Sequence, residues 1–153
     1  MRDMTQIMDV EVVHSTLVRA PIEKVYDSIT TGEGLDSWFT QGASVDRRPG
    51  GKIHFRWDGE RTAITEGIIE DGGPILEAIR PSSFVFQWSP DNNTYYTTVE
   101  LVFKEEEKGT RVTVKESGFQ DTLEGRKALI GCSTGWGEAL TMLKYYLEHG
   151  VKY

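Results

Sequence analysis

The chain has 153 residues, of which 38% are hydrophobic and 27% charged, with a formal net charge of −7. This length and composition fit one globular domain, so we expect a single domain over residues 1–153. The negative charge repels phosphate groups, which argues against nucleic-acid and anionic membrane-surface partners. Cys132 is the only cysteine, which excludes an internal disulfide. The chain shows neither a signal peptide nor a long apolar run, so we expect a cytoplasmic protein.

The first elements are a strand and two short helices. Residues 10–18 (VEVVHSTLV) are rich in β-branched side chains and predict a strand. Pro21 suits the first turn of the helix that follows, and Gly32 and Gly34 end that helix. The apolar residues of the first helix recur at helical spacing, and a second apolar turn follows: Ile22, Val25, Tyr26 and Ile29, then Leu35, Trp38 and Phe39.

A run of antiparallel strands is predicted next. After the turn at residues 49–51, apolar and polar residues alternate over 52–58, which is typical of a strand with one apolar face. Asp58-Gly59 indicates a hairpin, so we expect the partner strand over residues 62–69. Gly72-Gly73-Pro74 interrupts the pattern. Further strands are expected in this order: one carrying Phe84, Phe86 and Trp88, then 95–103 and 111–116.

The last predicted element is a long helix over residues 122–149. One apolar stripe at spacings of three and four runs along it: Leu129, Cys132, Trp136, Leu140, Leu143 and Leu147. The segment 131–137 (GCSTGWG) places three glycines in the helix interior, where each costs about 1 kcal/mol relative to alanine. Small residues there would either let the helix approach the sheet or leave space for a ligand beside Trp136.

This order of elements resembles the START-like superfamily, also called the Bet v 1-like or SRPBCC fold. The nearest resemblance is to the branch of the heat-shock-protein ATPase activator homologues. The residues that carry it run in order along the chain: Ala20-Pro21, Val25-Tyr26, Trp38-Phe39, Pro49-Gly50-Gly51, Phe55, Gly67, Phe86-Gln87-Trp88, Gly135-Trp136-Gly137, Leu140, Leu143 and Tyr146-Leu147-Glu148. The resemblance implies an α+β helix-grip fold, in which a curved antiparallel sheet grips a long C-terminal helix and two short helices follow the first strand.

Two features depart from the family pattern. Residues 71–81 form a longer and more apolar segment than a simple turn, which suggests an extra loop or strand near the mouth of a cavity. The eukaryotic co-chaperones that give the branch its name carry an additional domain, for which this chain has no room. The family name therefore does not by itself indicate a co-chaperone role.

The fold implies a function for the aromatic residues. In this architecture the space between helix and sheet often holds a small hydrophobic or amphipathic molecule, and such a site needs a mostly apolar lining. Each aromatic side chain taken alone is better explained by core packing, and only the fold favours a cavity lining for the set. We expect the set to line a ligand cavity, without cofactor or metal: Trp38, Phe39, Phe55, Trp57, Phe86, Trp88, Trp136 and Leu140.

Two alternatives use other residues. A cyclase- or dehydratase-like enzyme in the same cavity would need an inward-facing acid or base, for which His14, Glu66 and Glu100 are candidates, with Glu116 a further strand carboxylate. A protein-interaction module, co-chaperone-like or homodimeric, would instead present an exposed apolar patch, most plausibly near Val13 and Leu17. We expect His54 to point outward and Cys132 to be a buried, unreactive thiol. The sequence contains no nucleophile motif, P-loop or dinucleotide fingerprint.

Overall fold

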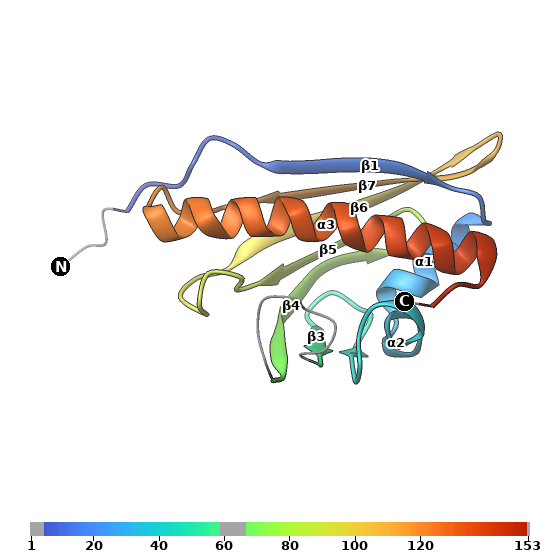
Figure 1. Cartoon of the computed structure of the whole chain (residues 1–153), viewed down its shortest axis with the longest axis horizontal. Coiled ribbons are helices and arrows are strands. Elements are labelled where there is room, and N and C mark those ends of the chain that lie inside the picture. The colour runs from blue at the N-terminus through green and yellow to red at the C-terminus, as the bar shows by residue number, and fades with distance from the viewer. Residues whose placement is uncertain (1–4, 59–66, 153) are drawn as a thin grey trace.

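The computed structural model describes residues 5–58 and 67–152. Its elements in chain order are β1 (Val12–Val18), α1 (Ile22–Thr30), α2 (Gly32–Trp38), β2 (Ser44–Val45), β3 (Lys52–Trp57), β4 (Ile69–Ile79), β5 (Ser83–Trp88), β6 (Thr97–Glu106), β7 (Gly109–Ser117) and α3 (Leu123–His149) (Figure 1). The predicted strand–helix–helix–strands–helix order is confirmed. None of the described helices is long and apolar enough to cross a membrane.

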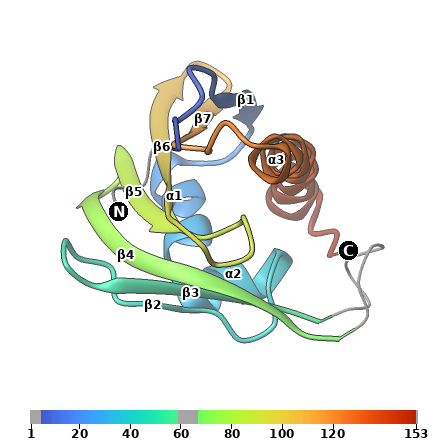
Figure 2. The ribbon, with the colours of Figure 1, turned by 90° about the vertical axis from the view of Figure 1, so that its left-hand side faces the viewer.

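The strands form one antiparallel, seven-stranded sheet in the order β1-β7-β6-β5-β4-β3-β2. The sheet curves, and α3 lies along its concave side, beside β1 and β7 (Figure 2). The strands β2, β3 and β4 curve away beneath the helix, with α1 and α2 at one end. This is the α+β helix-grip architecture expected from the sequence. It leaves β1 and the two-residue β2 as the edges of the sheet.

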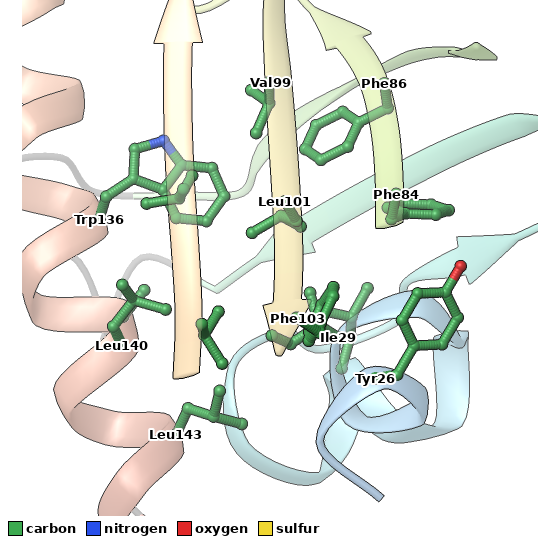
Figure 3. Packing of buried hydrophobic residues seen from close by; sticks show 14 of the residues in the cluster. Tyr26, Ile29, Phe84, Phe86, Val99, Leu101, Phe103, Trp136, Leu140 and Leu143 are labelled. Atoms are coloured by element: carbon green, nitrogen blue, oxygen red, sulfur yellow. The ribbon is translucent and has the colours of Figure 1, made fainter. Parts of the chain in front are cut away.

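The core lies between the concave face of the sheet and the apolar stripe of α3. Alternate residues of the central strands are buried, as a strand period of two requires. From α3, Trp136, Leu140 and Leu143 point toward the sheet, where side chains of β5 and β6 meet them (Figure 3). Tyr26 and Ile29 of α1 close the far end of this cluster.

A threonine and a glycine set the two ends of α3. Thr122 caps the N-terminus, because its hydroxyl oxygen accepts a hydrogen bond from the backbone N–H of Gly125 at 2.9 Å. Gly150 ends the helix in the left-handed conformation, with φ of 68°, which glycine adopts without a steric penalty. The predicted span of residues 122–149 is therefore confirmed.

The expectation for the segment around Gly72-Gly73-Pro74 was wrong. These residues do not interrupt the sheet but lie within β4, opposite His54, Ile53 and Lys52 of β3. Segment 71–81 is accordingly the greater part of a sheet strand rather than an extra loop. The glycines serve close packing, because a Cβ at Gly72 would overlap the carbonyl of Ile53 and one at Gly73 that of Gln87. Most of the partner strand expected over residues 62–69 lies outside the described residues, and the described pairing begins at Ile69.

Candidate functional site

Seven aromatic side chains form a continuous series of ring contacts, from α2 across the sheet to α3. We call them the aromatic wall: Trp38, Phe39, Phe55, Trp57, Phe86, Trp88 and Trp136. Phe55 and Trp57 stack at 5.4 Å with an interplanar angle of 3°. The indole of Trp88 lies 5.5 Å from that of Trp136, which joins β5 to α3. The structure thus brings together all the aromatic residues that the sequence singled out.

The wall is sealed at one end and partly open at the other. Phe55, Phe86, Trp88, Trp136 and the neighbouring Leu140 are buried. Phe39 and Trp57 are only half-buried, and their rings lie 5.4 Å apart. Trp38 supports this end from behind, because its buried ring stacks on Phe39 and its indole N–H donates to the carbonyl of Ser28.

A buried carboxylate lies at the sealed end of the wall. Glu116 has no solvent exposure. Its Oε2 accepts hydrogen bonds from the indole N–H of Trp88 at 2.7 Å and the hydroxyl of Thr97 at 2.6 Å, while its Oε1 accepts one from the indole of Trp136 at 2.8 Å. A buried polar group that is fully hydrogen-bonded is stable, whereas an unpaired one costs free energy. Glu116 therefore fixes the orientation of two tryptophans of the wall.

Burial dominates the acid–base properties of this end. It raises the pKa of Glu116, although the hydrogen bonds from Thr97, Trp88, Trp136 and Cys132 oppose the rise. The pKa of the Cys132 thiol is likewise raised by burial and further by the Glu116 carboxylate. Since a thiolate is the reactive form, the raised pKa disfavours reactivity of Cys132, whose side chain is half-buried rather than fully buried as predicted.

A second carboxyl group faces the interior from β4. Asp71 pairs with Phe55 across the strands and therefore lies on the same face of the sheet. Its Oδ1 accepts hydrogen bonds from the backbone N–H groups of Gly72 at 2.7 Å and Ser89 at 2.9 Å. Burial raises the pKa of Asp71 despite these two bonds. Its charge also contributes to the raised pKa of Cys132, so Asp71 acts across the interior on α3.

The candidates for an acid or base lie in different surroundings. Glu100 is exposed on the outer face of β6, because it alternates with buried Val99 and Leu101, so it does not meet the inward-facing condition of the enzyme alternative. His14 does face α3, where its Nε2 lies 2.9 Å from the carbonyl oxygen of Ser133. Glu66 lies outside the described residues. His54 is exposed and pairs with Glu70 on the outer face, as expected.

Sequence reasoning missed Asp71 altogether and left Glu116 undecided among the strand carboxylates. The alternation of side chains along β7 could have placed Glu116 on the inner face. It follows Val112 and Val114 at intervals of two, and both valines are buried. No such signal existed for Asp71, because its segment was interpreted as a break between strands.

The glycines of α3 have different surroundings. A Cβ built at Gly131 or Gly135 would meet nothing within 4 Å, so neither is needed for close approach to the sheet. A Cβ at Gly137 would meet the ring of His14 at 3.4 Å, which is an ordinary van der Waals contact between α3 and β1. Gly131 and Gly135 are exposed, and at none of these three glycines of α3 do the surroundings exclude a Cβ.

Two other kinds of site are not formed at the wall. In the described part of the chain no three His, Cys, Asp or Glu side chains come together as metal ligands. An open surface depression lies over the glycines of β4, but its lining is mostly polar: Lys52, His54, Glu70, Asp71 and Asn93. The aromatic wall is accordingly the best candidate for an apolar binding surface.

Together, the sheet, the long helix and the aromatic wall define a helix-grip protein of the Bet v 1-like class. The chain belongs to the family of Activator of Hsp90 ATPase homolog 1-like proteins, whose family model matches residues 19–148. No curated protein matches the sequence.

Solved structures agree with this assignment. The Aha1 dimer from Colwellia psychrerythraea is 25% identical with a TM-score of 0.74, over 92% of this chain and 98% of that one. Protein SSP2350 from Staphylococcus saprophyticus is also 25% identical. Its TM-score is 0.72, and the match covers 94% of this chain and 96% of that protein. Protein SA2116 from Staphylococcus aureus, at 16% identity, has a TM-score of 0.75 over 96% and 97% and shares the fold.

Proposed function

We propose that the protein binds a small hydrophobic or amphipathic molecule against the open end of the aromatic wall, between the sheet and α3. The observation that carries this proposal is the continuity of the wall, combined with the half-buried state of Phe39 and Trp57 at its open end. Large aromatic surfaces gain free energy when they leave water. A ligand with a flat or flexible apolar body would complete the burial of these two rings.

The position of α3 supports the proposal. Among the described elements, the backbone of α3 lies nearest to β1 and α2, whereas long side chains such as Trp136 and Trp88 bridge the distance to β5. Gly131 and Gly135 leave that helix without side chains at two exposed positions, where a Cβ would meet nothing within 4 Å. An apolar surface with a few convergent polar groups is the usual chemistry of small-molecule sites. Glu116 and Asp71 supply such polar groups.

A thermal-shift screen of the purified protein tests this proposal. The panel holds fatty acids, sterols, flavonoids and polyketide-like aromatics. A ligand at 100 times its dissociation constant stabilises the folded state by about 2.7 kcal/mol, which raises the melting temperature of a domain of this size by several degrees. We expect at least one class to produce such a shift. The absence of a shift across the whole panel would count against the proposal.

A pair of variants locates the site. Gly135→Leu places a side chain where a Cβ meets nothing within 4 Å, so the fold should persist while the ligand-induced shift is lost. Thr134→Leu is the matched control, since Thr134 is an exposed neighbour on the same helix. Equal loss of the shift in both variants, or in neither, would argue against a site beside α3.

A second proposal concerns self-association, and it rests on β1. This strand is an edge of the sheet, and Val13 on it is 50% exposed. Edge strands offer unpaired backbone groups to a second chain. The similar Aha1 protein from Colwellia psychrerythraea is described as a dimer. Sedimentation analysis should therefore find a homodimer that Val13→Lys converts to monomers, and a wild-type protein that is monomeric at all concentrations would contradict this.

A further inference from the structure

We propose that Asp71 anchors the polar end of the ligand, and that this end is a hydrogen-bond donor, a hydroxyl or an ammonium group, rather than a carboxylate. The inference rests on the proposed function and specifies which chemical class the site would select. It is carried by the position of Asp71, by its hydrogen bonds and by the charges around it.

Asp71 is positioned as part of the lining of the site. It lies opposite Phe55 of the aromatic wall, on the face of β4 that looks toward α3. The backbone N–H of Ser89, which directly follows Trp88 at the end of β5, donates to it. A polar group bound at Asp71 would therefore leave the apolar body of the ligand against Phe55 and Trp88.

The carboxyl group of Asp71 is held at one oxygen and free at the other. Two backbone N–H groups, those of Gly72 and Ser89, fix Oδ1. Among the described residues, none donates a hydrogen bond to Oδ2. Glu116 differs, because both of its oxygens accept hydrogen bonds from buried side chains. Asp71 is thus the carboxyl group on this face with an acceptor to offer.

The charge of the interior selects against anions. Asp71 and Glu116 are both acidic. The only charged group that acts on the pKa of Asp71 is His54 of the adjacent strand, which lowers it from the outer face, and no lysine or arginine in the described part of the chain forms an ion pair or a hydrogen bond with either acid. A carboxylate head group would lie beside two acidic groups in a medium where charge interactions are stronger than in water. A hydroxyl or ammonium group instead donates to Asp71, and an ammonium group also gains from the faces of the surrounding aromatic rings.

Three probes with the same aromatic body test this selection: 2-naphthalenemethanol, 2-naphthylmethylamine and 2-naphthoate. Their dissociation constants for the whole chain are measured by isothermal titration calorimetry. We expect the alcohol or the amine to bind at least tenfold more tightly than the carboxylate. If Asp71→Asn lowers the affinity for the amine more than the affinity for the alcohol, Asp71 recognises its partner by charge pairing rather than by neutral hydrogen bonding.

The Asp71→Asn variant keeps an oxygen that can accept from Gly72 and Ser89, so we expect it to fold. The substitution should weaken binding of the preferred probe about tenfold, and it should leave binding of the carboxylate probe unchanged or make it tighter. Glu70→Gln is the matched control, since Glu70 is the adjacent, exposed residue on the outer face of β4 and should change none of the three constants.

The outcomes separate this inference from the proposed function. Naphthoate bound as tightly as the other two probes by the wild-type chain would overturn the role of Asp71 and leave the binding site itself standing. Binding of none of the three would overturn both. The comparison among probes in the wild-type chain keeps the inference testable even if Asp71→Asn fails to fold.

Discussion

Trp136 of α3 donates its indole N–H to Glu116 of β7 at 2.8 Å, and this bond ties the C-terminal helix to the concave face of the sheet. The same carboxylate accepts a hydrogen bond from the indole N–H of Trp88 on β5. Glu116 thereby holds two tryptophans of the aromatic wall at fixed positions. A buried carboxylate at this place serves both the stability of the fold and the shape of the proposed site.

Glu116→Leu should destabilise the protein strongly, because three buried donors lose their acceptor at once: Trp88, Trp136 and Thr97. Each buried group left unpaired costs about 1–3 kcal/mol, so we expect a loss of at least about 3 kcal/mol. Glu116→Gln should lose less, since the amide oxygen still accepts. Urea denaturation measures both, and Glu100→Gln, on the exposed outer face, should stay within about 0.5 kcal/mol of wild type.

The pH dependence of this effect has a definite sign. Burial raises the pKa of Glu116 in the folded state, so between the ordinary value of 4.5 and the raised one the folded state binds more protons than the unfolded state. The free energy of unfolding therefore falls as pH rises through this window. The stability advantage of wild type over the non-titrating Glu116→Gln should be greatest below pH 4.5 and shrink toward neutral pH. An advantage that grows with pH would contradict the buried position of this carboxyl.

Gly131 and Gly135 should be replaceable by alanine with a gain in stability. Neither position has a neighbour that a Cβ would meet within 4 Å, and alanine is favoured over glycine in a helix interior by about 0.8–1.0 kcal/mol. Gly125→Ala is the contrasting variant, because its Cβ would overlap the carbonyl oxygen of Gln120. Thermal denaturation should therefore rank the first two variants above wild type and Gly125→Ala below it.

Substitutions at Phe55 and Trp57 should have different effects on the stability of the fold and on ligand binding. Phe55 is 2% exposed, so Phe55→Ala should cost about 3–5 kcal/mol. Trp57 is only half-buried, so Trp57→Ala should destabilise less but weaken any ligand that contacts the open end of the wall. The thermal shift caused by a ligand from the panel, compared between Trp57→Ala and wild type, measures this. An undiminished shift in Trp57→Ala would place the ligand elsewhere.

The periodicity of the sequence was sufficient for the order of the elements. The alternation around Phe55 and around Phe86 predicted strands, and the stripe containing Trp136 and Leu140 predicted the long helix, whereas the grip of the sheet on that helix was implied by the family resemblance. Local composition led to a wrong prediction in β4, because Gly72-Gly73-Pro74 has the composition of a turn. Neighbouring strands approach so closely there that glycine is required, and only the three-dimensional arrangement reveals that requirement.

The candidate site was predictable in its apolar part and less so in its polar part. Aromatic residues on alternating positions converge on one face, so the wall followed from the fold. The partners of a carboxylate depend on distant residues, as in the pairing of Glu116 with Trp136, 20 positions away. Asp71 was missed because its face could not be assigned without the register of β4 against β3.

The central claim, a ligand held against the aromatic wall between the sheet and α3, is tested most directly by nuclear magnetic resonance of the indole N–H groups. The chain has four tryptophans, so the indole region of a ¹H–¹⁵N spectrum is simple to assign with single substitutions. On titration with 2-naphthalenemethanol, or with a hit from the thermal-shift panel, the signals of Trp57, Trp88 and Trp136 should shift together and saturate at one dissociation constant. Indole signals that stay unchanged while the ligand binds would contradict the account.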